Sequence, residues 1–175
     1  MSQKTKILLF SSYYLPGFKA GGRIKTIQNM VDNLFDDVEF WIVTRDRDLN
    51  DNKPFANIEY EVWLDIGHAK VLYLPPDKLG IFSLIKVIKQ TPCDVLYLNS
   101  FFDAEFSFKV MVARKFRMYP SIPVVLAPRG EFSKGALSLK TWKKNIYIQL
   151  SSLLLLYSKI ILQASTEHEQ LDILR

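Results

Sequence analysis

Cysteine is almost missing from this sequence of 175 residues, because Cys93 is the only one. A single cysteine excludes an internal disulfide and a thiolate metal cluster, which fits a reducing compartment. Long apolar runs are missing as well. The most apolar stretch, 146–162, is broken by Gln149, Lys159 and several serines, whereas a membrane span needs about 20 mostly apolar residues. The apolar run at 7–10 is too short for the core of a signal peptide.

The remaining composition is that of an ordinary globular protein, with 49% apolar and 23% charged residues. The chain is long enough for one domain with a real core, and no linker or internal repeat divides it, so we expect one domain over 1–175. The formal net charge of +5 favours anionic partners such as phosphorylated small molecules, nucleic acid or an acidic membrane face. A mildly basic, solvated surface is the alternative interpretation.

The order of apolar segments predicts an α/β architecture. The run 6–11 is typical of a strand buried on both faces. A loop at 12–22 follows, and then a helix at 24–35 with its apolar residues on one face. A second strand at 38–43 completes a β-loop-α-β unit, the usual start of a parallel sheet.

Strands and helices continue to alternate along the rest of the chain. We expect further strands at 58–63, 70–74, 94–98, 124–127 and 159–164, and further helices at 79–89, 104–116, 139–157 and from Thr166 onward. In the longest helix the stripe expected to face the core comprises Trp142, Ile146, Leu150, Leu153, Leu154 and Tyr157. The sequence thus predicts a Rossmann-like, doubly wound α/β domain with a mainly parallel sheet and helices on both faces. Such sheets bind ligands beyond the carboxyl ends of their strands.

Two adjacent glycines, Gly21 and Gly22, precede the first expected helix. They let the backbone approach a ligand closely, and a helix N-terminus is a ready anion site. The loop is neither a G-x-G-x-x-G fingerprint nor a P-loop, and a flexible turn is the alternative.

Polar residues also follow two later strands. The loop 128–136 contains Arg129, Glu131 and Lys134, which can bind a polar or phosphorylated substrate or form only a weak surface ion pair. Asn99 stands at a strand end beside two phenylalanines and could hold a sugar hydroxyl or cap the next helix. We find no metal-ligand spacing and no nucleophile motif.

Three lysines, Lys140, Lys143 and Lys144, lie at the start of the longest apolar helix. Such lysines usually form a solvated face, but beside an apolar helix they can contact an anionic bilayer. We therefore expect a cytoplasmic protein, with peripheral contact at the inner face of the membrane as a hypothesis.

Four motifs occur in order along nearly the whole chain, at 14–16 with 21–22, at 94–99, at 128–137 and at 164–169. In this order and spacing they resemble the N-terminal domain of the family 4 glycosyltransferases, which have two facing Rossmann-like domains (the GT-B fold). The motif at 128–137, followed by the three lysines, is the most specific of the four.

The resemblance implies a retaining glycosyltransferase of the hexosyltransferase type. Such an enzyme moves a sugar from a nucleotide-sugar donor to the hydroxyl of a carbohydrate or glycolipid acceptor, in polysaccharide or glycolipid assembly. The donor diphosphate is then expected against Gly21, Gly22 and Arg23. The acceptor-binding residues that the resemblance implies are Asn99, Arg129, Gly130, Glu131 and Lys134. The nucleotide sugar is a substrate, and we expect no cofactor, no metal and no nucleic-acid partner.

The chain departs from the family pattern in two ways. Many relatives have a histidine near the strand end where this chain has Asn99, so no catalytic residue can be carried over. Relatives also place most nucleotide contacts and a Glu-x7-Glu motif in a C-terminal domain, and no two glutamates here stand eight apart. We therefore expect the C-terminal donor domain to be absent from this chain, and the isolated chain to have no or very weak transferase activity.

Two other classes of function are alternatives to the glycosyltransferase. A non-catalytic carbohydrate- or phosphate-binding module would keep the cleft without the chemistry, and a C-terminal domain encoded next to this chain would argue against it. A nucleic-acid binder would interleave aromatic and basic residues on one exposed face. Most aromatic residues here fall in expected strands or on apolar helix stripes, which disfavours that class.

Overall fold

The computed structural model describes residues 3–138 and 141–174, and within them seven strands form one sheet. The strands are β1 (Thr5–Phe10), β2 (Val38–Arg45), β3 (Trp63–Ile66), β4 (Ala69–Leu74), β5 (Val95–Leu98), β6 (Val124–Leu126) and β7 (Ile161–Leu162). The helices are α1 (Gly22–Leu34), α2 (Ile81–Gln90), α3 (Lys109–Lys115), α4 (Lys134–Ser138), α5 (Thr141–Leu153) and α6 (Glu167–Ile173), with a 3₁₀ turn η1 (Pro76–Lys78) and a π-helical turn η2 (Ala104–Phe108).

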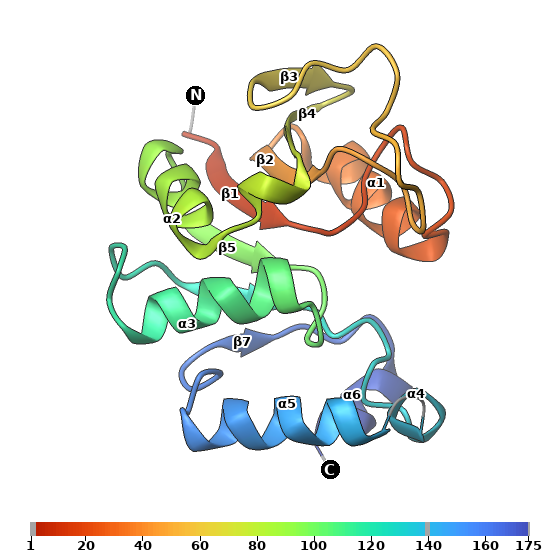
Figure 1. Ribbon diagram of the computed structural model, residues 1–175, viewed down its shortest axis with the longest axis vertical. Helices are drawn as coiled ribbons and strands as arrows, with labels where there is room; N and C mark the ends of the chain where they lie inside the picture. Colours follow the sequence, from red (N-terminus) through yellow and green to blue (C-terminus); the bar gives the residue numbers. More distant parts are fainter. Residues whose placement is uncertain (1–2, 139–140, 175) are drawn as a thin grey trace.

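The sheet has the order β3-β4-β2-β1-β5-β6-β7, and every pair is parallel except β3 with β4. Counted among the parallel strands alone, the order is 3-2-1-4-5-6, which is that of a Rossmann-like sheet. From β1 the chain first moves outward to β2 and later returns to add β5 on the other side (Figure 1). The crevice between the carboxyl ends of β1 and β5 is therefore the expected place for a ligand.

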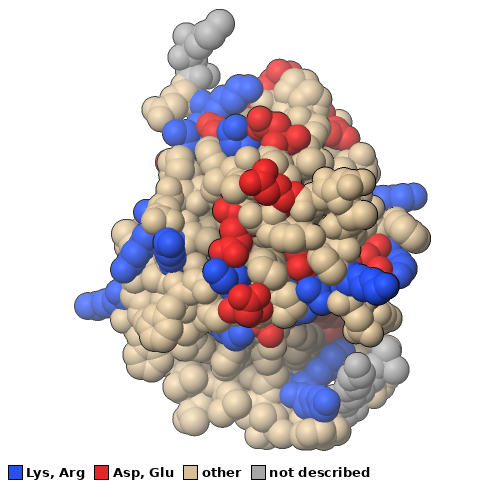
Figure 2. All heavy atoms as spheres, turned by 45° about the horizontal axis from the view of Figure 1, so that its top comes forward, with Lys and Arg blue, Asp and Glu red and all other residues tan. Residues whose placement is uncertain are grey.

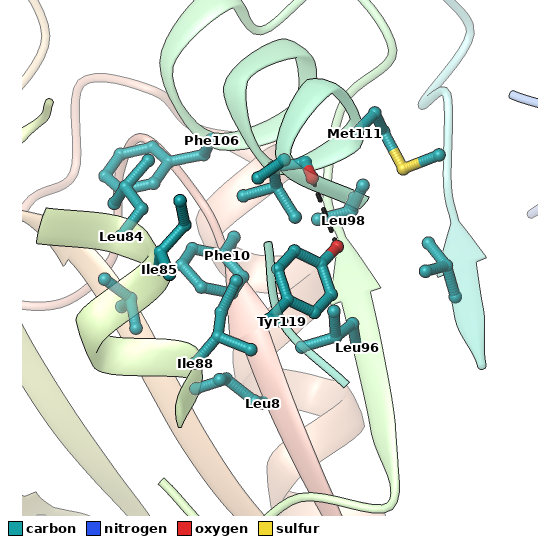
Figure 3. Packing of buried hydrophobic residues seen from close by; sticks show 14 of the residues in the cluster. Leu8, Phe10, Leu84, Ile85, Ile88, Leu96, Leu98, Phe106, Met111 and Tyr119 are labelled. Carbon is teal, nitrogen blue, oxygen red and sulfur yellow. Dashed lines mark hydrogen bonds between the residues drawn. The ribbon is translucent and has the colours of Figure 1, made fainter. Parts of the chain in front are cut away.

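Two clusters of buried side chains occupy the two faces of the sheet, because alternate residues of a strand point to opposite sides. Leu8 and Phe10 of β1 belong to the cluster under α2 and α3, whereas Leu9 belongs to the cluster under α1. Figure 3 shows the first cluster, in which the Tyr119 hydroxyl donates to the carbonyl of Val110 at 3.1 Å. Helices thus lie on both faces, and the predicted α/β architecture with a mainly parallel sheet is confirmed.

The strand predicted at 58–63 is wrong. The structure instead has β3 at Trp63–Ile66, which pairs with β4 through a tight turn at Gly67, where φ is +60°. The apolar residue Ile58 at the start of this range does not belong to a strand. Like Phe55 before it, it packs from the β2–β3 loop onto the cluster beside α1. This loop takes the place of a crossover helix between β2 and β4.

The prediction for the end of the chain also needs correction. Four residues of the stripe expected to be buried turn outward, namely Trp142, Ile146, Leu150 and Leu153 of α5. The other two, Leu154 and Tyr157, follow the helix and pack against the core as expected. The last strand is shorter than 159–164, and both residues of β7 are exposed at the edge of the sheet. Periodicity pointed to the outward stripe because it is the more apolar face of α5, whereas the face toward the core contains Tyr147 and the buried Ser151.

Two further elements differ from expectation. The helix predicted at 104–116 begins with the wider turn η2, and the Asp103 carboxylate caps it by accepting from the N–H groups of Glu105 and Phe106. The loop predicted at 128–136 leads directly into α4, which begins at Lys134. No helix in the described part of the chain is long and apolar enough to cross a membrane.

Candidate functional site

The carboxyl ends of β1, β5, β6 and β7 bring four of the predicted loops to one edge of the sheet. Two neighbouring pockets lie there. The α1–α6 pocket, of about 460 Å³, is lined by Ala20, Gly22, Arg23, Thr26, Arg129, Gly130, Ser165, Thr166 and Glu169. The α1–α5 pocket, of about 370 Å³, is lined by Arg23, Phe102, Arg129, Gly130, Glu131, Ala136 and Lys144. Because both pockets share Arg23, Arg129 and Gly130, we treat them as one candidate site.

The N-terminus of α1 faces this site. Gly21 precedes the helix with φ +57°, a left-handed conformation that favours glycine, and no side chain caps the helix. A Cβ placed on Gly21 or Gly22 would meet no atom within 4 Å, so the space in front of the helix is open. The N–H groups of Arg23 and Ile24 donate within the first turn, to the carbonyls of Ala20 at 3.4 Å and Gly21 at 3.1 Å. An anion in this space would therefore meet the positive end of the helix dipole beside Gly22 and the Arg23 side chain.

The loop before α1 is held by a carboxylate that sequence reasoning missed. Asp48, which is buried, accepts from the N–H groups of Phe18 at 2.7 Å and Lys19 at 3.0 Å. Burial raises the pKa of this carboxyl, but its backbone N–H bonds outweigh burial, and the pKa lies below the usual value. Gly17 is required because a Cβ there would lie 2.9 Å from the Tyr14 carbonyl oxygen. Hydrogen bonds to Asp48 and the close approach at Gly17 therefore hold the loop at 12–22 in place before α1.

Glu131 joins the α1 end of the site to the loop after β5. Its Oε1 accepts from Arg23 Nη2 at 3.1 Å and from Ser100 Oγ at 2.7 Å. Its Oε2 accepts from the backbone N–H groups of Phe101 at 2.6 Å and Phe102 at 3.1 Å. The buried carboxylate therefore fixes the turn at 100–102 and holds Arg23 beside it.

Arg129 ties three strand ends together. Its Nε donates to Asn99 Oδ1 at 2.7 Å, its Nη2 to the Tyr97 hydroxyl at 2.8 Å and its Nη1 to Ser165 Oγ at 2.9 Å. Burial raises the pKa of Tyr97, although the Arg129 charge opposes this, so the phenol keeps its proton and donates to Gln163 Oε1 at 2.6 Å. The guanidinium is thereby held in one orientation between β5, β6 and β7.

Glu169 is the second residue of the site that the sequence did not single out. A hydroxyl residue three positions before a glutamate is the spacing of a local helix cap, and Thr166 Oγ1 accepts from the Glu169 N–H at 3.1 Å. The Glu169 carboxylate also accepts from the N–H groups of Gly130 at 2.7 Å and Ser165 at 2.6 Å. The spacing could reveal only the local cap, because Gly130 lies 39 residues away.

The structure brings most of the predicted site residues together. Arg23 from the donor group contacts Glu131 from the acceptor group, and Asn99, Arg129 and Gly130 are adjacent to them. Lys134 is exposed at the start of α4 and lines neither pocket. Its place is taken by Lys144, whose Nζ lies 4.9 Å from the centre of the Phe102 ring.

The charges of the site favour an anionic ligand. Three cationic side chains (Arg23, Arg129 and Lys144) line the pockets, while both carboxylates, Glu131 and Glu169, are occupied by N–H and O–H donors of the protein. Among residues 3–138 and 141–174, no three His, Cys, Asp or Glu side chains are grouped as metal ligands would be. The arrangement is suited to binding and orienting a polar anion.

A separate pocket of about 320 Å³ lies between β3, β4 and α2. Two charged groups that line it, Lys78 Nζ and Glu61 Oε2, neutralise each other at 2.8 Å. This pocket lies beside β3 and β4, which form the opposite edge of the sheet from β6 and β7. We therefore assign the functional site to the pockets at Arg23 and Arg129.

Searches against models of known protein families and against curated proteins gave no significant match.

Proposed function

We propose that this chain is the acceptor-side, Rossmann-like half of a retaining family 4 glycosyltransferase with the GT-B fold. In this proposal the enzyme transfers a hexose from a nucleotide sugar to a carbohydrate or glycolipid acceptor. The donor diphosphate binds against Gly21, Gly22 and Arg23, and a second domain supplies the rest of the donor site.

One observation carries the proposal: the open N-terminus of α1 and the Arg129–Gly130 turn face each other across pockets that share Arg23. A helix N-terminus with an adjacent arginine supplies both N–H donors and positive charge for a phosphate. Arg23 is half exposed and Arg129 is fixed by its three partners. The site is therefore largely preorganised for an anion, which lowers the entropy lost on binding.

The acceptor is proposed to bind on the α1–α5 side of the site. Phe102 provides an apolar surface there, and Lys144 and Arg129 provide donors for hydroxyl or phosphate oxygens. Asn99 is buried and engaged with Arg129 and Ser11. We therefore propose that Asn99 positions the arginine and does not itself bind the sugar.

A non-catalytic carbohydrate- or phosphate-binding module is the second candidate. It is favoured by the full engagement of the Glu131 and Glu169 carboxylates in protein hydrogen bonds. Both oxygens of each carboxylate thus serve to hold the loops, a structural role that a binding module shares.

The experiment is a calorimetric titration of the chain with uridine, guanosine and adenosine diphosphates, and with the corresponding nucleosides. At least one diphosphate should bind, while its nucleoside should bind much more weakly. The variant Arg23→Ala should lower the diphosphate affinity by about tenfold, because a charge-assisted hydrogen bond is lost.

The matched control is Lys89→Ala, which removes an exposed cation from the last turn of α2 and should leave the affinity unchanged. Equal loss in both variants would mean that only the overall charge attracts the nucleotide. That result, or binding of no diphosphate, would overturn the donor-side assignment. Binding of a free sugar, with an affinity that Arg23→Ala leaves unchanged, would favour the module instead.

A further inference from the structure

The outward face of α5 is apolar and uncovered. Its exposed residues are Trp142, Ile146, Leu150 and Leu153, which recur at helical spacing. Leu155 is exposed in the turn after the helix. Trp142 is 66% exposed and Leu153 is 79% exposed. Soluble proteins rarely leave so many large apolar side chains together on one element unless something binds there. In Figure 1 the helix lies along one end of the molecule, with only its upper side toward the sheet.

The opposite face of α5 already supplies the contacts with the core. Tyr147 of α5 and Leu154, in the turn directly after it, pack against the cluster under α3, and the Tyr147 hydroxyl donates to the Phe101 carbonyl at 2.6 Å. Burial raises the pKa of this phenol far above its usual value, so the donor is permanent at physiological pH. The outward apolar stripe is therefore not needed for folding against the rest of the chain.

The charge of the surrounding segment is of one sign. Residues 132–166 contain no aspartate or glutamate and five lysines, namely Lys134, Lys140, Lys143, Lys144 and Lys159. This segment alone accounts for the formal net charge of +5, so the rest of the chain is balanced. Lys140 lies outside the described residues.

The described lysines occur at both ends of α5. Lys134 and Lys143 are exposed near its start, and Lys159 is exposed after its end, just before β7. In Figure 2 acidic side chains are spread over the upper and middle parts of the view, whereas the charged side chains in its lowest part are basic. Apolar and basic side chains without acidic ones are what an anionic lipid surface attracts.

We propose that α5 docks the protein on an anionic lipid bilayer. The apolar stripe enters the boundary between headgroups and acyl chains, and the lysines contact the lipid phosphates. Trp142 suits this position because its indole is amphipathic, and Lys143 Nζ lies 5.5 Å from the centre of its ring. A second copy of the chain is a poorer occupant, because two segments of the same positive charge would repel each other.

An apolar pocket of about 280 Å³ extends this surface. It lies between α5 and the turn that follows, and Ile148, Leu155 and Phe101 are among the residues that line it. At the other end of α5, Lys144 lines the α1–α5 pocket. Docking through α5 therefore places the candidate site beside the headgroups, but the docking itself holds whether or not the proposed function is correct.

The test is flotation of the full chain with vesicles of phosphatidylcholine that contain phosphatidylglycerol, compared with vesicles of phosphatidylcholine alone. The chain should float with the anionic vesicles, and high salt should release much of it because exposed charges are screened. Leu153→Ser and Lys143→Glu should each weaken the binding about tenfold, through lost apolar burial and lost charge attraction respectively.

Phe82→Ser is the matched control, because Phe82 is equally exposed, at 75%, but belongs to α2. This variant should float as the unchanged protein does, and circular dichroism will verify that all variants are folded. Equal flotation with neutral and anionic vesicles, no flotation, or equal effects of the α5 and Phe82 variants would overturn the proposal. A dimer in light scattering that Leu153→Ser dissociates would show that a second copy covers the face instead.

Discussion

At the scale of single residues, the site depends on buried carboxylates that bind backbone N–H groups. Asp48, Glu131 and Glu169 each hold a loop at the end of a strand. A buried carboxylate with several N–H donors stays ionised and binds them more strongly than a neutral acceptor would. These residues therefore position the glycines and arginines that line the candidate site.

Replacing Glu131 by glutamine tests this role at constant size. An amide has only one oxygen, so its NH₂ group must face either the Phe101 and Phe102 N–H groups or Arg23 and Ser100. We expect Glu131→Gln to lower the free energy of unfolding by about 2 kcal/mol, measured by urea denaturation. The control Glu167→Gln alters an exposed residue at the start of α6 and should change it by no more than about 0.5 kcal/mol. Equal effects would contradict the assigned role.

Asp48 predicts a specific dependence of stability on pH. Its pKa is lowered in the folded state, so its contribution is present above the pKa of the unfolded chain, about 3.9. That contribution is lost as the pH falls through the lower, folded-state pKa. Asp48→Asn should therefore be less stable than the unchanged protein at pH 7, by about 2 kcal/mol.

The same comparison at acid pH gives the decisive difference. Below about pH 4 the stability gap between Asp48→Asn and the unchanged protein should shrink, because the carboxyl of the latter becomes protonated. Urea denaturation across this pH range measures the gap, and Asp77→Asn, at an exposed position in η1, serves as control. A gap that stays constant down to pH 2 would mean that the ionised form is not what holds the loop.

At the scale of elements, α5 has an apolar outer face and an inner face that contains a buried polar side chain. Ser151 is buried on the inner face, and its hydroxyl has no hydrogen-bond partner within the part of the chain that the structure describes. An unsatisfied buried hydroxyl costs free energy that an alanine would not. The inner face is therefore not optimised for packing alone.

Ser151→Ala should consequently stabilise the protein, raising the free energy of unfolding by about 1 kcal/mol. Alanine also has the higher helix propensity, so the exposed neighbour Ser152→Ala is needed as a control for that part. Thermal denaturation of both variants separates the two effects. A Ser151→Ala variant that is no more stable than Ser152→Ala would show that the hydroxyl is satisfied, for instance by water.

At the scale of the whole molecule, the strand–helix order and the loops at the strand ends could be predicted from the sequence. The helix at 24–35 has the spacing of one apolar helix face, and the run at 6–11 is too short for a helix and is bounded by polar residues. Their predicted places match α1 and β1. The hairpin of β3 could not be predicted, because four residues carry too little pattern. The orientation of α5 could not be predicted, because its more apolar face points away from the core.

The residues of the site could be predicted from the sequence, but the hydrogen bonds that join them could not. Arg129 and Asn99 were singled out because each follows an apolar strand, which is a local signal. Their hydrogen bond, and that of Gly130 with Glu169, join residues 30 and 39 positions apart. Only the parallel register of β5, β6 and β7 brings these residues together, and sequence periodicity does not specify register between strands.

The central claim is that the open end of α1 and the Arg129–Gly130 turn bind a nucleoside diphosphate. The most direct measurement is a titration of the ¹⁵N-labelled chain with uridine, guanosine and adenosine diphosphates, followed by the amide resonances. With at least one of them, the largest shifts should occur at Gly21, Gly22, Arg23 and Gly130, and the β3–β4 hairpin should be unaffected. Shifts centred on the pocket between β4 and α2, or no shifts with any of the three, would contradict the claim.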